Sequence, residues 1–389
     1  MVTRTAIKRR SRCTPTIPSC RVIHLAVSSV TPTIIFRWVD PAGAGRAAAT
    51  PRTIATASSG ERARGMSTHS TTGPRKIHPP SCDHRAVDEI RAIDDGELER
   101  WVAAMRAVDE HTDTVEGYLD WRRQAEATVW LLASDGEADI GAGIGIIGWH
   151  EPPGVARAEV RVVGGARGRG LGTALVERLG NWATALGYIE LLGEVREVDL
   201  ESLAWTQRRG YVEVGRNARL VLELESVEAP DVDPPAGVEI LTWAERPELI
   251  EQIYAVACEA YPDVPGEGDE VMPAFEQWLS MDMQGAGDRP EATFVALAGN
   301  DVVGYAKFSL SNARPGVAMH DMTGVRRSWR GRGIAGALKR AEIAWAKHNG
   351  FTRLETMNEE RNEPIRRLNE RHGYRPEPGK VVVRGPIAR

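Results

Sequence analysis

Two short stretches rich in glycine and arginine are the parts of this sequence best suited to bind an anion. They consist of Arg167, Gly168, Arg169, Gly170, Leu171, Gly172 and Thr173, and of Arg330, Gly331, Arg332, Gly333, Ile334, Ala335 and Gly336. Each stretch follows a β-branched segment and begins an amphipathic helix. The first turn of a helix has N–H groups without partners, glycine lets a ligand approach the backbone, and arginine adds positive charge. Both stretches are therefore predicted to bind a pyrophosphate or a similar anion.

The two stretches belong to a longer internal repeat. Arg330 follows Arg167 by 163 positions, and the same offset relates Trp182 to Trp345. It also relates two glycine–aromatic pairs near the end of each copy, Gly187-Tyr188 to Gly350-Phe351 and Gly210-Tyr211 to Gly373-Tyr374. A single ungapped offset over roughly 45 residues indicates two copies of one domain, because the repeats of a solenoid are much shorter.

The elements that position these stretches follow the same order in both copies. In the first copy we expect strands at 85–92, 128–133, 140–149 and 156–163 before the stretch, and helices at 95–109 and 115–125. After the stretch we expect a helix to about 186, a strand at 188–195, a helix at 200–209 and closing strands at 211–224. The second copy repeats this order from residue 238 to residue 383. Each copy is thus predicted to be a mixed α/β domain, with a central, mostly antiparallel sheet flanked by helices.

Composition shifts divide the 389 residues into four segments. We expect a leader at 1–82, a first domain at 84–224, a proline-rich acidic linker at 225–236 and a second domain at 237–389. Residues 1–65 hold eleven Lys and Arg against Asp40 and Glu61, and show no sustained period. Three interpretations of the leader stay open: a translated upstream region with Met66 as the true start, a disordered basic tail, or a transit-type peptide.

Charge and cysteine usage exclude several functional classes. The net charge of −5 includes this basic leader, so the rest of the chain is acidic, which argues against nucleic acid as a partner. No run reaches the ~18 apolar residues of a membrane span. The four cysteines have neither metal-ligand nor disulfide-framework spacing. We therefore expect a cytoplasmic protein, monomeric or homodimeric, that binds no metal, nucleic acid or membrane.

Together with the valines that precede them, Val162 and Val325, the two stretches resemble the acyl-CoA-binding motif of the GNAT N-acetyltransferase superfamily, Arg/Gln-x-x-Gly-x-Gly/Ala. The order of the predicted elements is also similar, as is the closing helix that ends in Gly-Tyr. The resemblance covers about residues 84–383 and is nearest to tandem two-domain acetyltransferases, a type that includes mycothiol synthase. It implies acetyl-CoA as the cosubstrate and a primary amine of a small molecule as the acceptor, which attacks the thioester directly.

The resemblance also implies roles for single residues. The pyrophosphate would lie on the amides of 168–173 or 331–336, and the strand near Val162 or Val325 would bind the pantetheine arm. Asn362 matches the cofactor-contacting Asn of the family, whereas the first copy has Asp199 there, so the C-terminal copy is predicted to be catalytic.

Candidates for the general base lie in the strand before each stretch. His320 and Asp321 are adjacent and should point to opposite faces of the sheet, and Glu159 is the candidate in the first copy.

The proton donor and the acceptor remain open in the sequence. The tyrosine that serves as general acid in the family falls at Asn369 and Thr206, which cannot supply a proton in its place, so water and Tyr374 are the remaining candidates. The acidic loop 261–270 would favour a cationic amine. Since both copies lack the tyrosine, an acyl-CoA-binding protein without catalytic activity stays an alternative.

Overall fold

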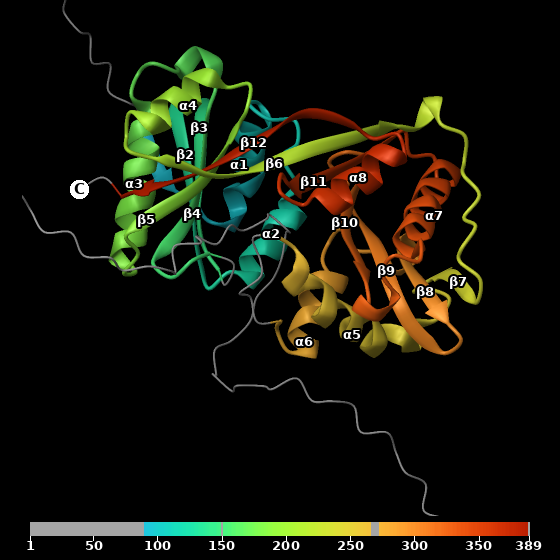
Figure 1. The fold of residues 1–389 in the computed structure, drawn as a ribbon. Helices are drawn as coiled ribbons and strands as arrows, with labels where there is room; N and C mark the ends of the chain where they lie inside the picture. Colours follow the sequence, from blue (N-terminus) through green and yellow to red (C-terminus); the bar gives the residue numbers. More distant parts are fainter. Residues whose placement is uncertain (1–88, 149–150, 266–271, 388–389) are drawn as a thin grey trace, which may run out of the picture.

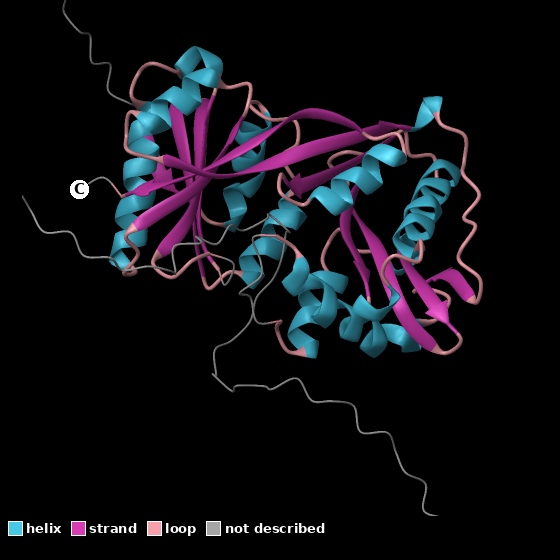
Figure 2. Ribbon diagram, in the orientation of Figure 1, coloured by secondary structure: helices cyan, strands magenta, loops and turns pink. Residues whose placement is uncertain are grey.

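The computed structural model describes residues 89–148, 151–265 and 272–387. The expected leader, 1–82, lies outside them. The described chain forms two lobes joined by one twelve-stranded sheet, and helices cover its faces (Figures 1 and 2). The strand order is β1-β2-β3-β4-β5-β12-β6-β11-β10-β9-β8-β7. The predicted architecture, two tandem domains of mixed α/β type with a mostly antiparallel sheet, is confirmed.

The first copy forms the elements expected of it. Its strands are β1 (Glu89–Ala92), β2 (Ala127–Asp135), β3 (Ala138–Ile147), β4 (Val155–Val162), β5 (Glu190–Arg196) and β6 (Val212–Glu223). Its helices are α1 (Leu98–Arg106), α2 (Val115–Gln124), α3 (Leu171–Ala185) and α4 (Leu200–Gln207). Side chains alternate along β2, where Trp130 and Leu132 pack with α1, while Leu131 and Ala133 pack with α3. The sheet therefore has a core on each face.

The second copy repeats this arrangement. Its strands are β7 (Val238–Thr242), β8 (Thr293–Ala298), β9 (Asp301–Leu310), β10 (Val317–Val325), β11 (Arg353–Glu359) and β12 (Arg375–Pro386). Its helices are α5 (Ile250–Ala260), α6 (Phe275–Trp278), α7 (Ile334–His348) and α8 (Glu363–Arg371). A π-helical turn, Leu279–Met283, follows α6, so the helix expected at 270–281 is short in its described part. Helix α7 packs on one face of the sheet, and α5 with α6 on the other.

The strands expected to close each domain are present, but they are exchanged between the lobes. β12, from the end of the chain, lies between β5 and β6, and β6 lies between β12 and β11. Val381 of β12 is opposite Val195 of β5, whereas Leu220 of β6 is opposite Thr356 of β11. In Figure 1 these two long strands cross from one lobe to the other. Each lobe is thus completed by a strand of the other copy.

In both lobes two parallel strands part from each other next to the glycine-rich stretch. β4 pairs with β5 only from Val155 to Arg157, and β10 pairs with β11 only from Val317 to His320. β4 continues to pair with β3 in unbroken register, but β10 has a bulge between His320 and Met322. The bulge leaves Asp321 as an extra residue, which bends the strand and redirects side chains. The two copies therefore differ where their strands separate.

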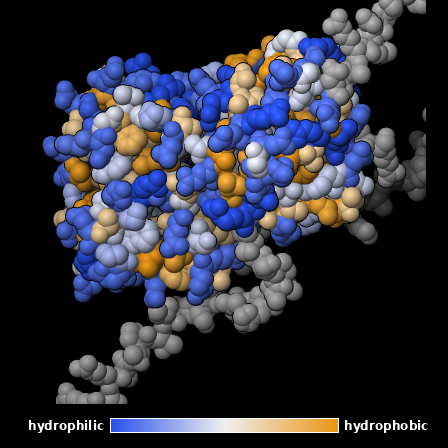
Figure 3. All heavy atoms as spheres, turned by 180° about the vertical axis from the view of Figure 1, so that it is seen from behind, coloured by the Kyte–Doolittle hydropathy of each residue, from blue (hydrophilic) through white to orange (hydrophobic). Residues whose placement is uncertain are grey.

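The helices and one face of the outer surface can be examined for apolar character. Among the helices that the structure describes, none has both the length and the apolar character that a membrane span requires. Seen from behind, both lobes are covered mainly by hydrophilic side chains, with apolar ones scattered among them (Figure 3). Scattered apolar side chains are normal on a folded protein.

Candidate functional site

The glycine-rich stretches form open helix starts. Gly170 and Gly333 are the residues before α3 and α7, with φ of 89° and 87°, and neither helix has a side-chain cap. Gly168 and Gly331 also have positive φ, which glycine adopts at low cost. A Cβ added at Gly168, Gly170 or Gly331 would have no atom within 4 Å. Both turns therefore have uncapped N–H groups and room for an anion, so they fit a pyrophosphate.

The first arginine of each stretch ties the turn to the preceding strand. Arg167 Nε donates to the Val162 carbonyl at 3.3 Å, and Arg330 Nε donates to the Val325 carbonyl at 3.0 Å. Each guanidinium also contacts a carboxylate, Asp199 at 3.2 Å in the first lobe and Asp263 at 2.6 Å in the second. Hydrogen bonds from Arg327 and Arg330 lower the pKa of Asp263 to about 2. The two turns are thus built alike, with a different acid beside each.

A cavity of about 1120 Å³ lies between the lobes and extends to the first turn. Its wall includes Arg167, Gly168 and residues 170–173 of that turn, the separated parts of β4 and β5, and residues of β9, β10 and β11. No residue of the second turn, 330–336, belongs to this wall. His320, Asp321 and Glu159, the three predicted catalytic residues, all border it.

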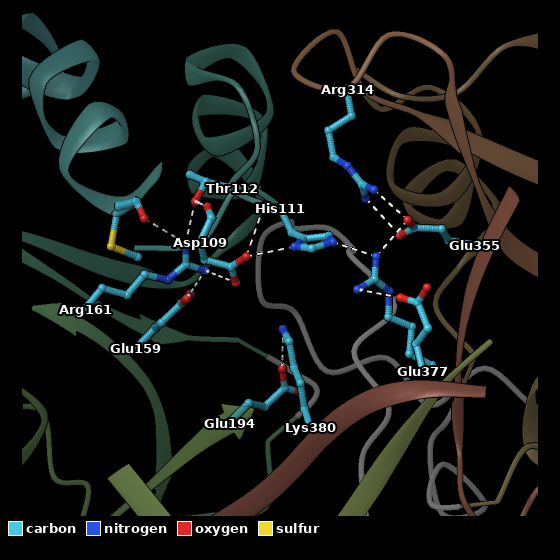
Figure 4. A network of polar contacts seen from close by, with 12 residues as sticks. Asp109, His111, Thr112, Glu159, Arg161, Glu194, Arg314, Glu355, Glu377 and Lys380 are labelled. Atoms are coloured by element: carbon cyan, nitrogen blue, oxygen red, sulfur yellow. Dashed lines mark hydrogen bonds and ion pairs between the residues drawn. The ribbon is translucent and has the colours of Figure 1, made fainter. Parts of the chain in front are cut away.

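A chain of polar contacts crosses this cavity from lobe to lobe (Figure 4). His111 Nδ1 lies 2.9 Å from Asp109, and its Nε2 lies 2.6 Å from an Arg219 nitrogen. Since arginine only donates, Nε2 accepts and Nδ1–H donates to Asp109, which fixes the tautomer. Arg219 and Arg314 both donate to Glu355, at 2.7 Å and 2.6 Å. The segment between α1 and α2 is thereby held to β6 and β11.

The wall between β4 and β5 is charged. Glu159 pairs with Arg161, and Lys380 of the exchanged strand β12 donates to Glu194 at 3.0 Å. Asn217 of β6 donates to the other oxygen of Glu194 at 3.0 Å. Lys380 could not be found from the sequence, because only the strand exchange brings it to the first lobe.

His320 faces α7, on the side of the sheet opposite to Asp321, as strand alternation predicts. Its Nδ1 lies 3.0 Å from Lys339 Nζ and 3.1 Å from Glu342, and its Nε2 contacts the Tyr374 hydroxyl. Burial lowers the pKa of His320 to about 4 and raises that of Tyr374 well above its ordinary value. The two candidates therefore contact each other in a buried cluster.

Asp321 faces α5 and α6 and joins a cluster that the sequence did not reveal. Lys307 Nζ of β9 lies 2.6 Å from Asp321, 2.6 Å from Asp288 and 3.8 Å from Asp282. Burial, followed by the charges of Asp321 and Asp288, raises the pKa of Asp282 to about 7, although Lys307 opposes the shift. The cluster combines one ammonium with three carboxyl groups, of which Asp288 and Asp321 border the cavity.

The residues before and within the last helices also differ between the copies. Asn362 precedes α8 without capping it, whereas Asp199 accepts from the Ser202 N–H at 3.0 Å and so caps α4. At the positions of the family's tyrosine, Asn369 donates to Asn358 at 3.2 Å and Thr206 donates to the Leu203 carbonyl at 2.8 Å. Both side chains are engaged within the protein.

Comparisons with known proteins agree with this geometry. A model of the acetyltransferase (GNAT) family matches residues 92–211 and 250–374. The chain is similar to the crystal structure of a GCN5-related N-acetyltransferase from Sphaerobacter thermophilus, with a TM-score of 0.59, 25% identity, and coverage of 77% of this chain and 96% of that one. It shares its fold with a tandem GNAT protein from the clavulanic acid biosynthesis pathway, with a TM-score of 0.62, 19% identity, and coverage of 77% and 99%. A comparison with curated proteins gave no match. Each family match contains one glycine-rich turn.

Proposed function

Because a model of the family matches both halves, the chain belongs to the acetyltransferase (GNAT) family, and we propose that it is an N-acetyltransferase. Acetyl-CoA donates the acetyl group, and a primary amine of a small molecule attacks the thioester directly. The observation that carries this proposal is the uncapped helix start beside two separated parallel strands, which occurs in both lobes. Such a start offers backbone N–H groups to a pyrophosphate.

We assign catalysis to the C-terminal copy. Its strand β10 has the bulge at Asp321, whereas β4 is regular. At the offset of 163 positions, Met322 and Met357 replace Glu159 and Glu194 of the first copy. An acetyl group is apolar, so methionine side chains suit it better than carboxylates, whose desolvation is costly.

In this copy the chain's own residues bind the cosubstrate and prepare the acceptor. The amides of 331–336, with Arg330 beside them, hold the pyrophosphate of acetyl-CoA. The β10 backbone near Val325 binds the pantetheine arm, and the Asn362 amide makes a further contact with the cosubstrate. Acetyl-CoA supplies an activated acyl carbon. Both residues of the adjacent pair border the cavity, but Asp321 is the better base, because its side chain is more exposed and contacts Lys307, while His320 contacts the buried Lys339 and Glu342.

The charges of the cavity support a cationic amine as the acceptor. Near the first turn, within 167–173 and 195–211, four arginines and two carboxylates line the wall. In the rest of the wall, nine carboxylates stand against six arginine and lysine side chains. The part of the cavity away from the first turn, which includes Asp288 and Asp321 of the C-terminal copy, is thus suited to an ammonium ion.

The N-terminal copy supports a second candidate function. Its turn borders the cavity, and its strands separate beside a charged wall that includes the Glu159–Arg161 ion pair. With Thr206 and Asn369 both engaged within the protein, an acyl-CoA-binding protein without turnover is the alternative.

Two matched double variants test these assignments on the full chain. Arg330→Glu with Gly333→Glu disrupts the second turn, and Arg167→Glu with Gly170→Glu disrupts the first, with the same charge change and the same strain at positive φ, about 1–2 kcal/mol. We expect Arg330→Glu with Gly333→Glu, and not the variant of the first turn, to abolish thiol release from acetyl-CoA in a screen of primary amines. Loss of turnover only in Arg167→Glu with Gly170→Glu would assign catalysis to the N-terminal copy instead. Calorimetric binding of acetyl-CoA without thiol release from any amine would favour the binding protein.

A further inference from the structure

The cluster around Lys307 lies directly at the proposed acceptor site. Lys307 is fully buried, with a side chain 1% exposed, on the strand that faces the bulge of β10. Asp288 and Asp321 border the cavity, whereas Asp282 lies behind them and accepts from Trp278 Nε1 at 2.8 Å. The two carboxylates at the wall are therefore held from behind by one ammonium.

The bulge is what brings Asp321 to this ammonium. His320 is opposite Phe308 and Met322 is opposite Lys307, so Asp321 is the extra residue. His320 packs towards α7, while Met322 packs among the side chains of α5 and α6. Without the bulge, one residue of β10 rather than two would face Lys307.

The charges of the cluster do not balance. One ammonium is shared by three carboxyl groups, so two negative charges are in excess when all three ionise. The buried hydroxyl groups of Tyr261 and Tyr305 face the same cluster and carry no charge at neutral pH. Excess negative charge in a buried site increases its affinity for a proton. A proton taken from an ammonium ligand would reduce this excess negative charge.

We propose that Lys307 is a positioning residue that holds Asp321 and Asp288 at the cavity wall as the pair that receives a proton from the ammonium group of the acceptor. This inference rests on the proposed acetyltransferase function. Lys307 acts through the two carboxylates, and it sets both their orientation and their affinity for the proton.

The proton and electron balance follows from this geometry. One N–H proton of the ammonium passes to the carboxylate pair, and the lone pair that remains on nitrogen forms the C–N bond with the thioester carbon. The C–S bond breaks, and its electron pair goes to sulfur. The nitrogen then loses a second proton, which the thiolate takes up, while the carboxylate pair returns the first proton to water.

The test compares Lys307→Met with Lys307→Arg in the full chain, and uses Lys339→Met as a control. Lys339 is equally buried, with a side chain 1% exposed, but it lies on α7, contacts His320 and does not border the cavity. We expect Lys307→Met to lower kcat by about 100-fold, the lower range for general base catalysis. We also expect the acid limb of its pH–kcat profile to move to higher pH, because uncompensated carboxylates bind protons more tightly.

Lys307→Arg keeps the charge, so its acid limb should stay near that of the wild type even if packing lowers its stability. Lys339→Met should lose stability and keep the limb in place. The proposal would be overturned if the acid limb of the pH–kcat profile did not move in Lys307→Met, or if it moved equally in Lys339→Met. Lys307 would then be a structural residue.

A second measurement requires no turnover and separates this inference from the proposed function. The infrared absorption of protonated carboxyl groups is followed from pH 5 to pH 9 without substrate, and we expect it to persist to higher pH in Lys307→Met. An unchanged titration overturns the inference even if the enzyme is active. A shifted titration in a protein that acetylates no amine leaves the cluster as described and refutes the function.

Discussion

The contact between the lobes can be tested at Glu355, where charge removal should be costly. Its side chain is fully buried on β11 and accepts from Arg219 of β6 and from Arg314, at 2.7 Å and 2.6 Å. Arg353 donates to it as well, at 2.8 Å. Glu355→Gln preserves the shape, but it removes the charge and turns an amide N–H group towards donating guanidinium groups.

The expected loss in the free energy of unfolding follows from the proton affinity of the Glu355 carboxyl group. Burial opposes its ionised form, but hydrogen bonds from Arg314 and Arg219 and their charges lower its pKa from 4.5 to about 2. A change of this size corresponds to about 3 kcal/mol. Water in the adjacent cavity screens part of it, so we expect Glu355→Gln to lower the free energy of unfolding by about 2–3 kcal/mol at pH 7.

The sign of the pH dependence is fixed by the lowered pKa. The stabilisation by Glu355 is fully present above pH 4.5 and is lost as the pH falls towards 2. Urea unfolding of the wild type and of Glu355→Gln, from pH 7 down to pH 3, measures the difference. Glu223→Gln is the matched control, because Glu223 pairs with the same Arg353 on the surface and should cost less than about 1 kcal/mol. A difference under 1 kcal/mol at pH 7, or one that does not shrink with acid, would refute the reasoning.

Two further predictions concern the exchanged strand and the second turn. Val381→Ala changes a residue of the C-terminal copy, but it should destabilise the first lobe by about 2 kcal/mol, because Val381 packs with Ile147, Ala156 and Leu191. Hydrogen exchange should then accelerate at the amides of β5, and acceleration confined to β10 and β11 would contradict the exchange. Asp263→Asn removes the carboxylate that pairs with Arg327 and Arg330, so we expect acetyl-CoA to bind up to about fivefold more tightly, in line with the small energy of an exposed ion pair. Calorimetry measures this, and weaker binding would show that Asp263 supports the turn.

The sequence alone determined the features that depend on short stretches of chain. Glycines 168, 170, 331 and 333 mark turns with positive φ, because no other residue adopts that conformation as cheaply. Alternation along β10 placed His320 and Asp321 on opposite faces of the sheet. The common offset of 163 positions revealed two copies, and the order of the helical and strand patterns predicted the fold of each. All of these features are local or periodic, so they can be read along the chain.

Only the tertiary structure decided which strand closes which lobe. β6 and β12 end equivalent copies, so either could pair with β5 or with β11, and no local pattern distinguishes the two pairings. The exchange brings Lys380 to Glu194 and Arg219 to Glu355, contacts between residues more than a hundred positions apart. The bulge at Asp321 and its contact with Lys307 likewise depend on the register between β9 and β10. Strand pairing over such separations is set by the packing of whole layers, and for that reason Lys307 and Lys380 could be named as residues of the cavity wall only from the folded chain.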